Sequence, residues 1–167
     1  ISAGTLTVTG RLNSGTYNSN ITNEGAFIYN STSDQKLGGV ISLTGTLEKA
    51  NSSTLTLSGA NTYTGTTTVT AGTLEVDGTL AQTAVDVESG ATYDVDATDT
   101  VLSIEGAGTI DLTDAALTAG DGNNQTFSGV FNGSNTFTKV GDGVLTLSGN
   151  NSSASYSGKL VIDAGTI

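Results

Sequence analysis

Residues 139–149 read Lys-Val-Gly-Asp-Gly-Val-Leu-Thr-Leu-Ser-Gly, and the second half of this stretch alternates apolar and hydroxyl-bearing side chains. The same alternation recurs along the chain, for example in Thr-Leu-Thr-Val-Thr at 5–9 and Val-Asp-Val at 85–87. A period of two is typical of a β-strand with one buried face. Gly, Asn or Asp separates these segments, and no run of ten or more residues has a helical period. The pattern predicts an all-β chain.

The composition agrees with short strands joined by frequent turns. Thr (30), Gly (23), Ser (18) and Asn (13) make up about half of the 167 residues. Sixteen acidic residues against five basic ones give a net charge of −11, and no Lys or Arg occurs between Lys49 and Lys139. This charge disfavours nucleic acid and anionic membranes as partners. Because no apolar run reaches the roughly 18 residues of a transmembrane helix, we expect no direct membrane insertion by this segment.

An internal repeat organises the chain. One short motif, Ala-Gly-Thr followed by Leu or Ile, occurs three times, at Ala3–Leu6, Ala71–Leu74 and Ala164–Ile167. Between these motifs, the sequence of residues 39–59 aligns with that of residues 129–149 at a constant offset of 90. A three-residue turn insertion near 152–154 then shifts the offset to 93. The alignment predicts that Leu57 and Leu147 occupy equivalent inward positions.

The second copy of the repeat is longer than the first. About 22 extra residues lie between Gly90 and Gly129, where 101–104 and 109–112 fit as added strands. A repeat that gains one such unit while its neighbours stay in register behaves like a solenoid, in which each coil contacts only adjacent coils. At that coil length the chain makes about seven to eight coils. Residues 1–167 are then a single β-helix segment, with two diverged repeat units at about 3–74 and 71–167.

The order of the motifs resembles a known family. Lys-x-Gly-x-Gly-x-Leu-Thr-Leu-Ser-Gly-x-Asn, then Tyr-x-Gly, then Ala-Gly-Thr-Leu, is similar to the autotransporter-associated β-strand repeat of type V secreted (autotransporter) passenger domains. Residues 139–167 carry it, and so do residues 49–74, with Asn51 and Ser53 in place of Gly. The resemblance implies a right-handed parallel β-helix (β-solenoid) that is a fragment of a longer passenger. It also implies export through the periplasm to the cell surface, or the exterior, of a Gram-negative bacterium.

The function implied by this resemblance is that of a non-catalytic structural or adhesive rod. Its partners would be a glycan or protein on a host or neighbouring cell, or another copy of itself. No cofactor is expected. Parallel β-helices also carry polysaccharide-degrading enzymes, which need a general acid and a general base. Here His is absent and Arg11 is the only arginine, so we expect no enzyme.

Asp94 and Asp96 are the strongest candidate metal ligands. On a strand, two residues so spaced carry their carboxylates on one face, about 7 Å apart. That spacing suits a calcium ion, or the acid and base of a calcium-assisted polysaccharide-degrading enzyme. Asp99 would add a third oxygen ligand, and Asp86 and Glu88 are candidates on an adjacent coil. Solvated aspartates on an outer face are the simpler interpretation of the same residues.

A further alternative comes from the densest run of threonines. Its members are Thr62, Thr64, Thr66, Thr67, Thr68 and Thr70. A flat threonine array on a β-solenoid could order water or contact sugars, which would make the chain an ice- or glycan-binding protein. Ordinary β-branched strand and turn residues have the same pattern.

Overall fold

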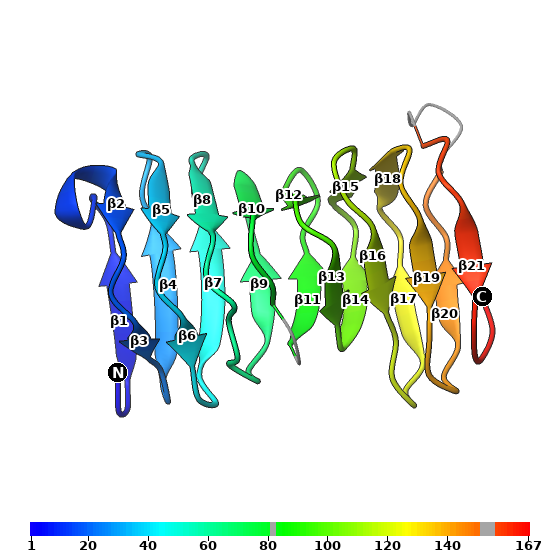
Figure 1. Cartoon of the computed structure of the whole chain (residues 1–167), viewed down its shortest axis with the longest axis horizontal. Helices are drawn as coiled ribbons and strands as arrows, with labels where there is room; N and C mark the ends of the chain where they lie inside the picture. The colour runs from blue at the N-terminus through cyan, green and yellow to red at the C-terminus, as the bar shows by residue number, and fades with distance from the viewer. Residues whose placement is uncertain (81–82, 151–155) are drawn as a thin grey trace.

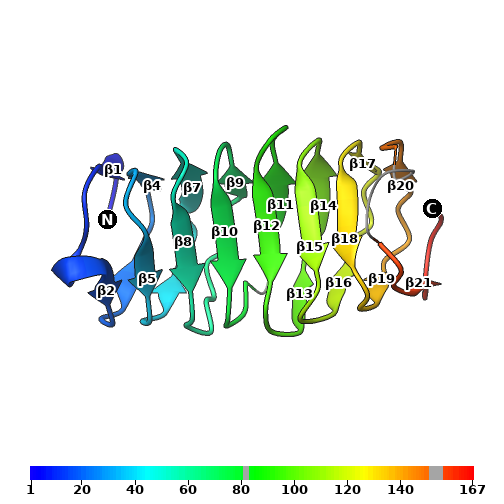
Figure 2. The same ribbon diagram turned by 90° about the horizontal axis from the view of Figure 1, so that it is seen from above.

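The computed structural model describes residues 1–80, 83–150 and 156–167. These residues form one elongated stack of parallel strands, with the first and last residues near opposite ends of the stack (Figures 1 and 2). The helical content of the described residues is a single 3-10 turn, η1, at Asn13–Gly15. The predicted all-β parallel β-helix is therefore confirmed. The longest sheet has eight strands, one for each turn of the stack, which agrees with the seven to eight coils expected.

The strands follow three faces around each coil, named here A, B and C. Face A is an eight-stranded sheet of β1 (Thr5–Val8), β4 (Ala26–Asn30), β7 (Thr46–Ala50), β9 (Thr67–Val69), β11 (Ala84–Val87), β14 (Ser103–Gly106), β17 (Gln125–Phe127) and β20 (Leu145–Leu147). Face B is a seven-stranded sheet of β2 (Thr16–Tyr17), β5 (Gln35–Leu37), β8 (Thr54–Leu57), β10 (Thr73–Val76), β12 (Thr92–Val95), β15 (Thr109–Leu112) and β18 (Val130–Gly133). Face C comprises two smaller sheets, β3 (Ile21–Thr22) with β6 (Ile41–Ser42), and β13 (Asp99–Val101), β16 (Leu117–Ala119), β19 (Phe137–Lys139) and β21 (Leu160–Ile162).

The register of the strands fixes the length of each coil, and that length is not constant. Thr5 pairs with Ala26, whereas Thr67 pairs with Val85, so the coil is shorter near the middle of the stack. Within the stretch where the sequence predicts the extra unit, β13, β14 and β15 supply one strand each to faces C, A and B. The expected single strand at 101–104 is wrong in detail. A corner at Leu102 divides it, because β13 ends on face C and β14 begins on face A.

The alternating pattern places apolar side chains inside the stack and hydroxyl or acidic ones outside. Leu57 is fully buried and Leu147 is half-buried against the same core. They lie on different faces, however, since β8 belongs to face B and β20 to face A. The constant offset between the two copies is therefore not a whole number of coils, and the copies start on different faces. The turn insertion expected near 152–154 lies outside the described residues.

Buried side-chain nitrogen and oxygen atoms in the described residues all have hydrogen-bond partners. Asn61 shows how corners are satisfied: its side-chain oxygen accepts the Ile41 N–H at 2.9 Å, and its amide donates to the carbonyls of Gly59 and Thr79. Such pairing is needed because an unpaired polar group inside a protein costs about 1 to 3 kcal/mol. The corners are therefore specified by side chains as well as by the strand ladders.

Candidate functional site: the acidic face

Six carboxylates gather on the outer side of face B and on the turns that follow its strands. This set, called the acidic face below, is Glu75, Asp77, Asp94, Asp96, Asp111 and Asp114. The strand register explains the gathering, since Glu75 pairs with Asp94 and Asp94 with Asp111 on the adjacent strands β10, β12 and β15. Neighbouring strands lie about 4.8 Å apart. Identical outward positions on successive coils therefore hold like charges close together.

Three of these side chains form the tightest cluster. One carboxylate oxygen from each of Glu75, Asp77 and Asp96 lies within 4.8 Å of the other two. Lys36 Nζ is 2.6 Å from Asp77 Oδ2, and the Thr56 hydroxyl donates to Glu75 Oε1 at 3.2 Å. Hard oxygen ligands in such an arrangement are of the kind that calcium prefers, and exposed acidic groups are common without an ion.

The electrostatics of the acidic face raise the pKa of three of its members, Asp94, Glu75 and Asp96. Partial burial raises the pKa of Asp94 to about 7, with the negative charges of Asp96, Asp111, Glu75 and Asp114 acting in the same direction. Burial likewise raises the pKa of Glu75, although the hydrogen bond from Thr56 lowers it. The pKa of Asp96 is also raised, first by burial and then by its acidic neighbours.

Asp99 has a different environment from the other two predicted ligands. Its side chain is buried, and its carboxylate accepts hydrogen bonds from the N–H groups of Leu80 (2.9 Å) and Thr100 (2.8 Å) and from the hydroxyl of Tyr93 (3.1 Å). Burial raises the pKa of Asp99, and these hydrogen bonds lower it. The structure thus gives Asp99 a role in closing an inner corner and does not bring it into the outer cluster.

The neighbours of Asp94 and Asp96 also differ from those expected. Asp86 lies on face A, where it pairs with Glu105. Glu75 and Asp77 are not among the ligands that the sequence analysis predicts, yet each precedes one aspartate of the Asp-Val-Asp pair by the same spacing. That spacing is one coil, because Glu75 pairs with Asp94 in the register of face B. A search at the coil spacing would have found both.

The threonine run does not form one array. Thr67 is buried, and its hydroxyl forms hydrogen bonds with the hydroxyl groups of Tyr63 (2.6 Å) and Thr83 (3.0 Å). Thr62 and Thr64 precede β9 and are exposed, whereas Thr68 lies on face A. The run therefore turns a corner and does not present the flat surface that an ice- or glycan-binding array needs.

A different hydroxyl-bearing column occurs on face C. Thr100, Thr118 and Thr138 are paired in register on β13, β16 and β19, one above the other. Each lies a full coil from the next in the sequence, so no local threonine run reveals them. Side chains that stack in register can interact along the ladder and stabilise it.

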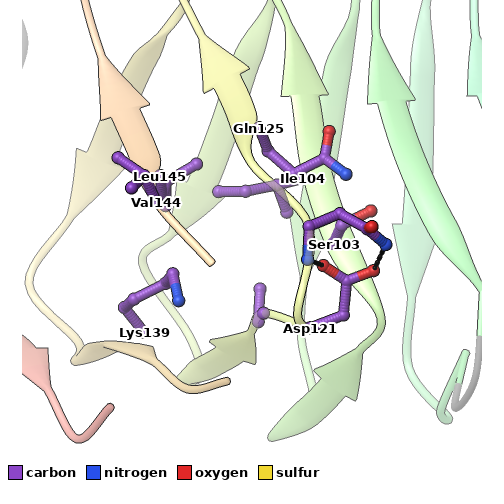
Figure 3. Close-up of a pocket in the computed structure, with 10 residues that line it drawn as sticks. Ser103, Ile104, Asp121, Gln125, Lys139, Val144 and Leu145 are labelled. Atoms are coloured by element: carbon purple, nitrogen blue, oxygen red, sulfur yellow. Dashed lines mark hydrogen bonds between the residues drawn. The ribbon is translucent and has the colours of Figure 1, made fainter. Parts of the chain in front are cut away.

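Two cavities among the described residues illustrate the hollows of the rod, and neither of these two is lined by the acidic face. One, of about 10 Å³, lies at a corner between faces C and A, with Ser103, Asp121, Gln125 and Lys139 around it (Figure 3). That volume is about the space of a single water. The other, of about 320 Å³, lies in the first coils and is mostly apolar, with Leu6 in its lining. Neither pairs two carboxylates across a space for a sugar ring.

No helix of the described residues is long and apolar enough to cross a membrane.

Comparison with known proteins agrees with the internal repeat. Residues 47–76 and 137–167 each match the passenger-associated transport repeat. The chain is 35% identical over 135 residues to the adhesin BmaC autotransporter of Brucella suis biovar 1 (strain 1330), an alignment that covers 74% of this chain and 4% of that protein. No solved structure matches the chain. Two segments of the chain thus match the passenger-associated transport repeat, and about three quarters of its length is similar to a short part of an autotransporter adhesin.

Proposed function

We propose that the chain is a non-catalytic segment of the rod of an autotransporter-like passenger, secreted or held at the surface of a Gram-negative bacterium. The observation that carries this proposal is the uninterrupted stack of parallel coils that includes both transport repeats. In such a stack each coil contacts only its neighbours, so length is gained by adding coils. The rod extends the passenger, and its outer faces are available for adhesion.

The distribution of charge supports adhesion without bond chemistry. Glycosidases place a general acid and a second carboxylate on either side of the scissile bond. The carboxylates of the acidic face instead lie side by side on the outside of one sheet. A net charge of −11 favours a basic or cation-bridged partner. A surface glycan or protein, or a second copy of the rod, is the class of partner that we propose.

Removal of one coil tests the rod function in the full-length passenger. Because Ala26 pairs with Thr46 and Phe27 with Leu47, deletion of residues 27–46 joins Ala26 to Leu47 in register. We expect this variant to be exported and displayed at the parent level with a shorter rod. Deletion of residues 27–36 breaks the register and should abolish display. Equal loss of display in both variants would contradict the proposal, as would depolymerisation of a polysaccharide by the purified chain.

Neutral substitutions separate an adhesive face from a spacer. The variant Glu75→Gln, Asp77→Asn, Asp96→Asn removes the three charges of the tight cluster on face B, and Asp86→Asn with Glu105→Gln is a control that removes two paired carboxylates on face A. We expect the face B variant to reduce attachment of displaying bacteria to cultured cells, and the face A variant to have a smaller effect. Unchanged attachment in both variants, with display intact, would leave the rod as a spacer and contradict adhesion through the acidic face.

A further inference from the structure

Two lysines lie inside the rod. Lys49 is 0% exposed and Lys139 is 3% exposed, although lysine is among the side chains least often buried. Lys49 lies in the inward column of face A, between Tyr29 and Val69, and Lys139 lies in the inward column of face C, after Ala119. Both lie in a segment that matches the transport repeat, and both lie in the last two residues of a strand, just before a corner.

Each ammonium group is bound by three backbone carbonyls. Lys49 Nζ donates to the oxygens of Ala50 (3.0 Å), Asn51 (2.8 Å) and Ala71 (3.0 Å). The first two oxygens belong to the corner that follows the lysine, and the third to the equivalent corner of the next coil. Three donors meet three acceptors, which is the full capacity of a lysine ammonium.

The second copy repeats this geometry. Lys139 Nζ donates to the oxygens of Val140 (2.5 Å), Gly141 (2.7 Å) and Ala164 (3.5 Å). The partners occupy the same motif positions as in the first copy: the two positions after the lysine, and the alanine of Ala-Gly-Thr.

The glycine of Ala-Gly-Thr is required by the same corner. Gly72 has φ +70°, and a Cβ added there would lie 2.4 Å from the Ser53 oxygen and 2.9 Å from Lys49 Nζ. Gly165 has φ +73°, with the corresponding Cβ 3.0 Å from Lys139 Nζ. Any side chain at this position would collide with the carbonyl cluster or the ammonium. The lysine and the glycine lie on successive coils, far apart in sequence, and are thus two parts of one structural unit.

The unit does not depend on a particular face. The Lys49 corner leads from face A to face B, whereas the Lys139 corner leads from face C to face A. Two different corners of the fold therefore contain an equivalent lysine ammonium and three equivalent carbonyl groups. Burial lowers the pKa of Lys49 to about 8, and the charge of Asp34 acts in the opposite direction, so the ammonium form dominates at mildly acidic pH.

We propose that the shared geometry of these two corners is an internal cation site: three carbonyls from two successive coils form a pocket for a primary ammonium, and the lysine of each transport repeat fills it to lock one coil to the next. The lock is a property of the fold and does not rest on the adhesive function proposed above. The lock explains why the repeat contains both the Lys and the Ala-Gly-Thr motif, which an adhesive function does not explain.

Lysine to methionine substitutions test whether the charge is needed. Methionine keeps an unbranched apolar stem and leaves the three carbonyls unpaired. At about pH 6.5, we expect Lys49→Met to lower the melting temperature of the 167-residue chain by about 5 °C or more. Lys139→Met should lower it in the same direction, and Lys159→Met, at an exposed lysine, should leave it unchanged. Melting of Lys49→Met at the parent temperature would overturn the proposal.

Chemical rescue distinguishes a cation site from a packing defect. Lys49→Ala removes the atoms from Cγ to Nζ, which n-propylammonium replaces. We expect n-propylammonium chloride to raise the melting temperature of Lys49→Ala in a concentration-dependent manner, as for any ligand that binds only the folded state. Sodium chloride, n-propanol and the exposed control Lys159→Ala should show no such rise. If Lys49→Ala does not fold alone, the refolding yield with n-propylammonium is measured instead, and failure of the amine to outperform n-propanol would overturn the proposal.

Discussion

The Lys49 corner and the acidic face both hold charged side chains, and they differ in how that charge is paired. Lys49 is inside the stack, yet its three donors all have carbonyl acceptors. Asp94 is on the outside, yet the groups nearest to it on adjacent coils are Glu75 and Asp111, which carry the same sign of charge. The buried charge is therefore well paired and the surface charge is not.

Pairing, more than depth of burial, therefore decides the free-energy cost of a charged side chain in this fold. Stacking in register repeats each position at about 4.8 Å. For an ammonium beside carbonyl groups this repetition supplies acceptors from two coils. For a carboxylate it supplies another carboxylate.

The largest effect is expected when an unpaired charge is placed inside the stack. Leu57→Asp introduces a carboxylate into a fully buried position among apolar side chains. We expect a loss of about 4 kcal/mol or more in the free energy of unfolding, measured by urea denaturation. Leu147→Asp, in the same Leu-Thr-Leu-Ser-Gly segment but half-buried, should lose less. Equal losses would contradict the difference in burial.

A smaller but clear loss is expected when the lysine corner is obstructed from the opposite coil. Gly72→Ala combines a positive φ with backbone oxygens 2.4 and 2.5 Å from the added Cβ, and we expect it to cost about 2 kcal/mol or more. Gly122→Ala is the matched control, because nothing lies within 4 Å of its added Cβ. Denaturation that does not distinguish the two variants would show that the corner tolerates a side chain.

The acidic face should make stability depend on pH. Because the pKa of Asp94 is raised to about 7, the folded state holds this proton more tightly than the unfolded chain does. The contribution of Asp94 to the free energy of unfolding is therefore fully present below about pH 4 and is lost as pH rises through about 7. Allowing for solvent screening, we expect roughly 1 kcal/mol from this group. Asp94→Asn should flatten the dependence, and Asp86→Asn on face A should not. A steeper pH dependence of stability in Asp94→Asn would contradict this prediction.

The smallest effect is expected from calcium. With a dissociation constant in the millimolar range typical of weak extracellular sites, about 2 mM calcium would stabilise the chain by about 0.6 kcal/mol. The prediction from sequence placed the ligands at Asp94, Asp96 and Asp99, and the structure offers Glu75, Asp77 and Asp96 as the compact trio. Asp96→Asn should remove the response and Asp99→Asn should not, as measured by calorimetric titration. An unresponsive parent chain would leave the carboxylates as solvated surface.

The fold was predictable because its signals are local. Alternation in segments such as 145–147 defines strands, and the recurrence of Ala-Gly-Thr-Leu reveals the solenoid. The face on which each segment lies was not predictable in the same way. Coil length differs along the stack, as the pairings of Thr5 with Ala26 and of Thr67 with Val85 show. Small differences accumulate, and the two repeats therefore begin on different faces.

The candidate site was predictable only in part for the same reason. Asp94 lies in β12 and Asp96 directly follows the end of that strand, so the two-residue period predicts that they lie near each other. Glu75 and Asp77 join them through the register of face B, in which one coil (Glu75 to Asp94) is 19 residues long and not the roughly 22 that the repeat predicts. Asp99 follows the strand into the next corner, where the chain turns its carboxylate inward to the Leu80 N–H. Corners change the direction of side chains in a way that spacing along the sequence does not reveal.

Hydrogen exchange resolved by residue tests the contrast between the two charged regions most directly. The Thr70 N–H donates to the Lys49 carbonyl at 2.9 Å, and the Asp96 N–H donates to the Val76 carbonyl at 3.1 Å. After correction for intrinsic rates, we predict that protection at Thr70 is nearly the same at about pH 5 and about pH 7.5, because the lysine corner stays largely charged and paired. Protection at Asp96 should fall at the higher pH as the neighbouring Asp94 carboxylate, whose pKa is raised to about 7, ionises. Equal changes at both amides, or a larger fall at Thr70, would contradict the conclusion that pairing makes the buried charge the more stable of the two.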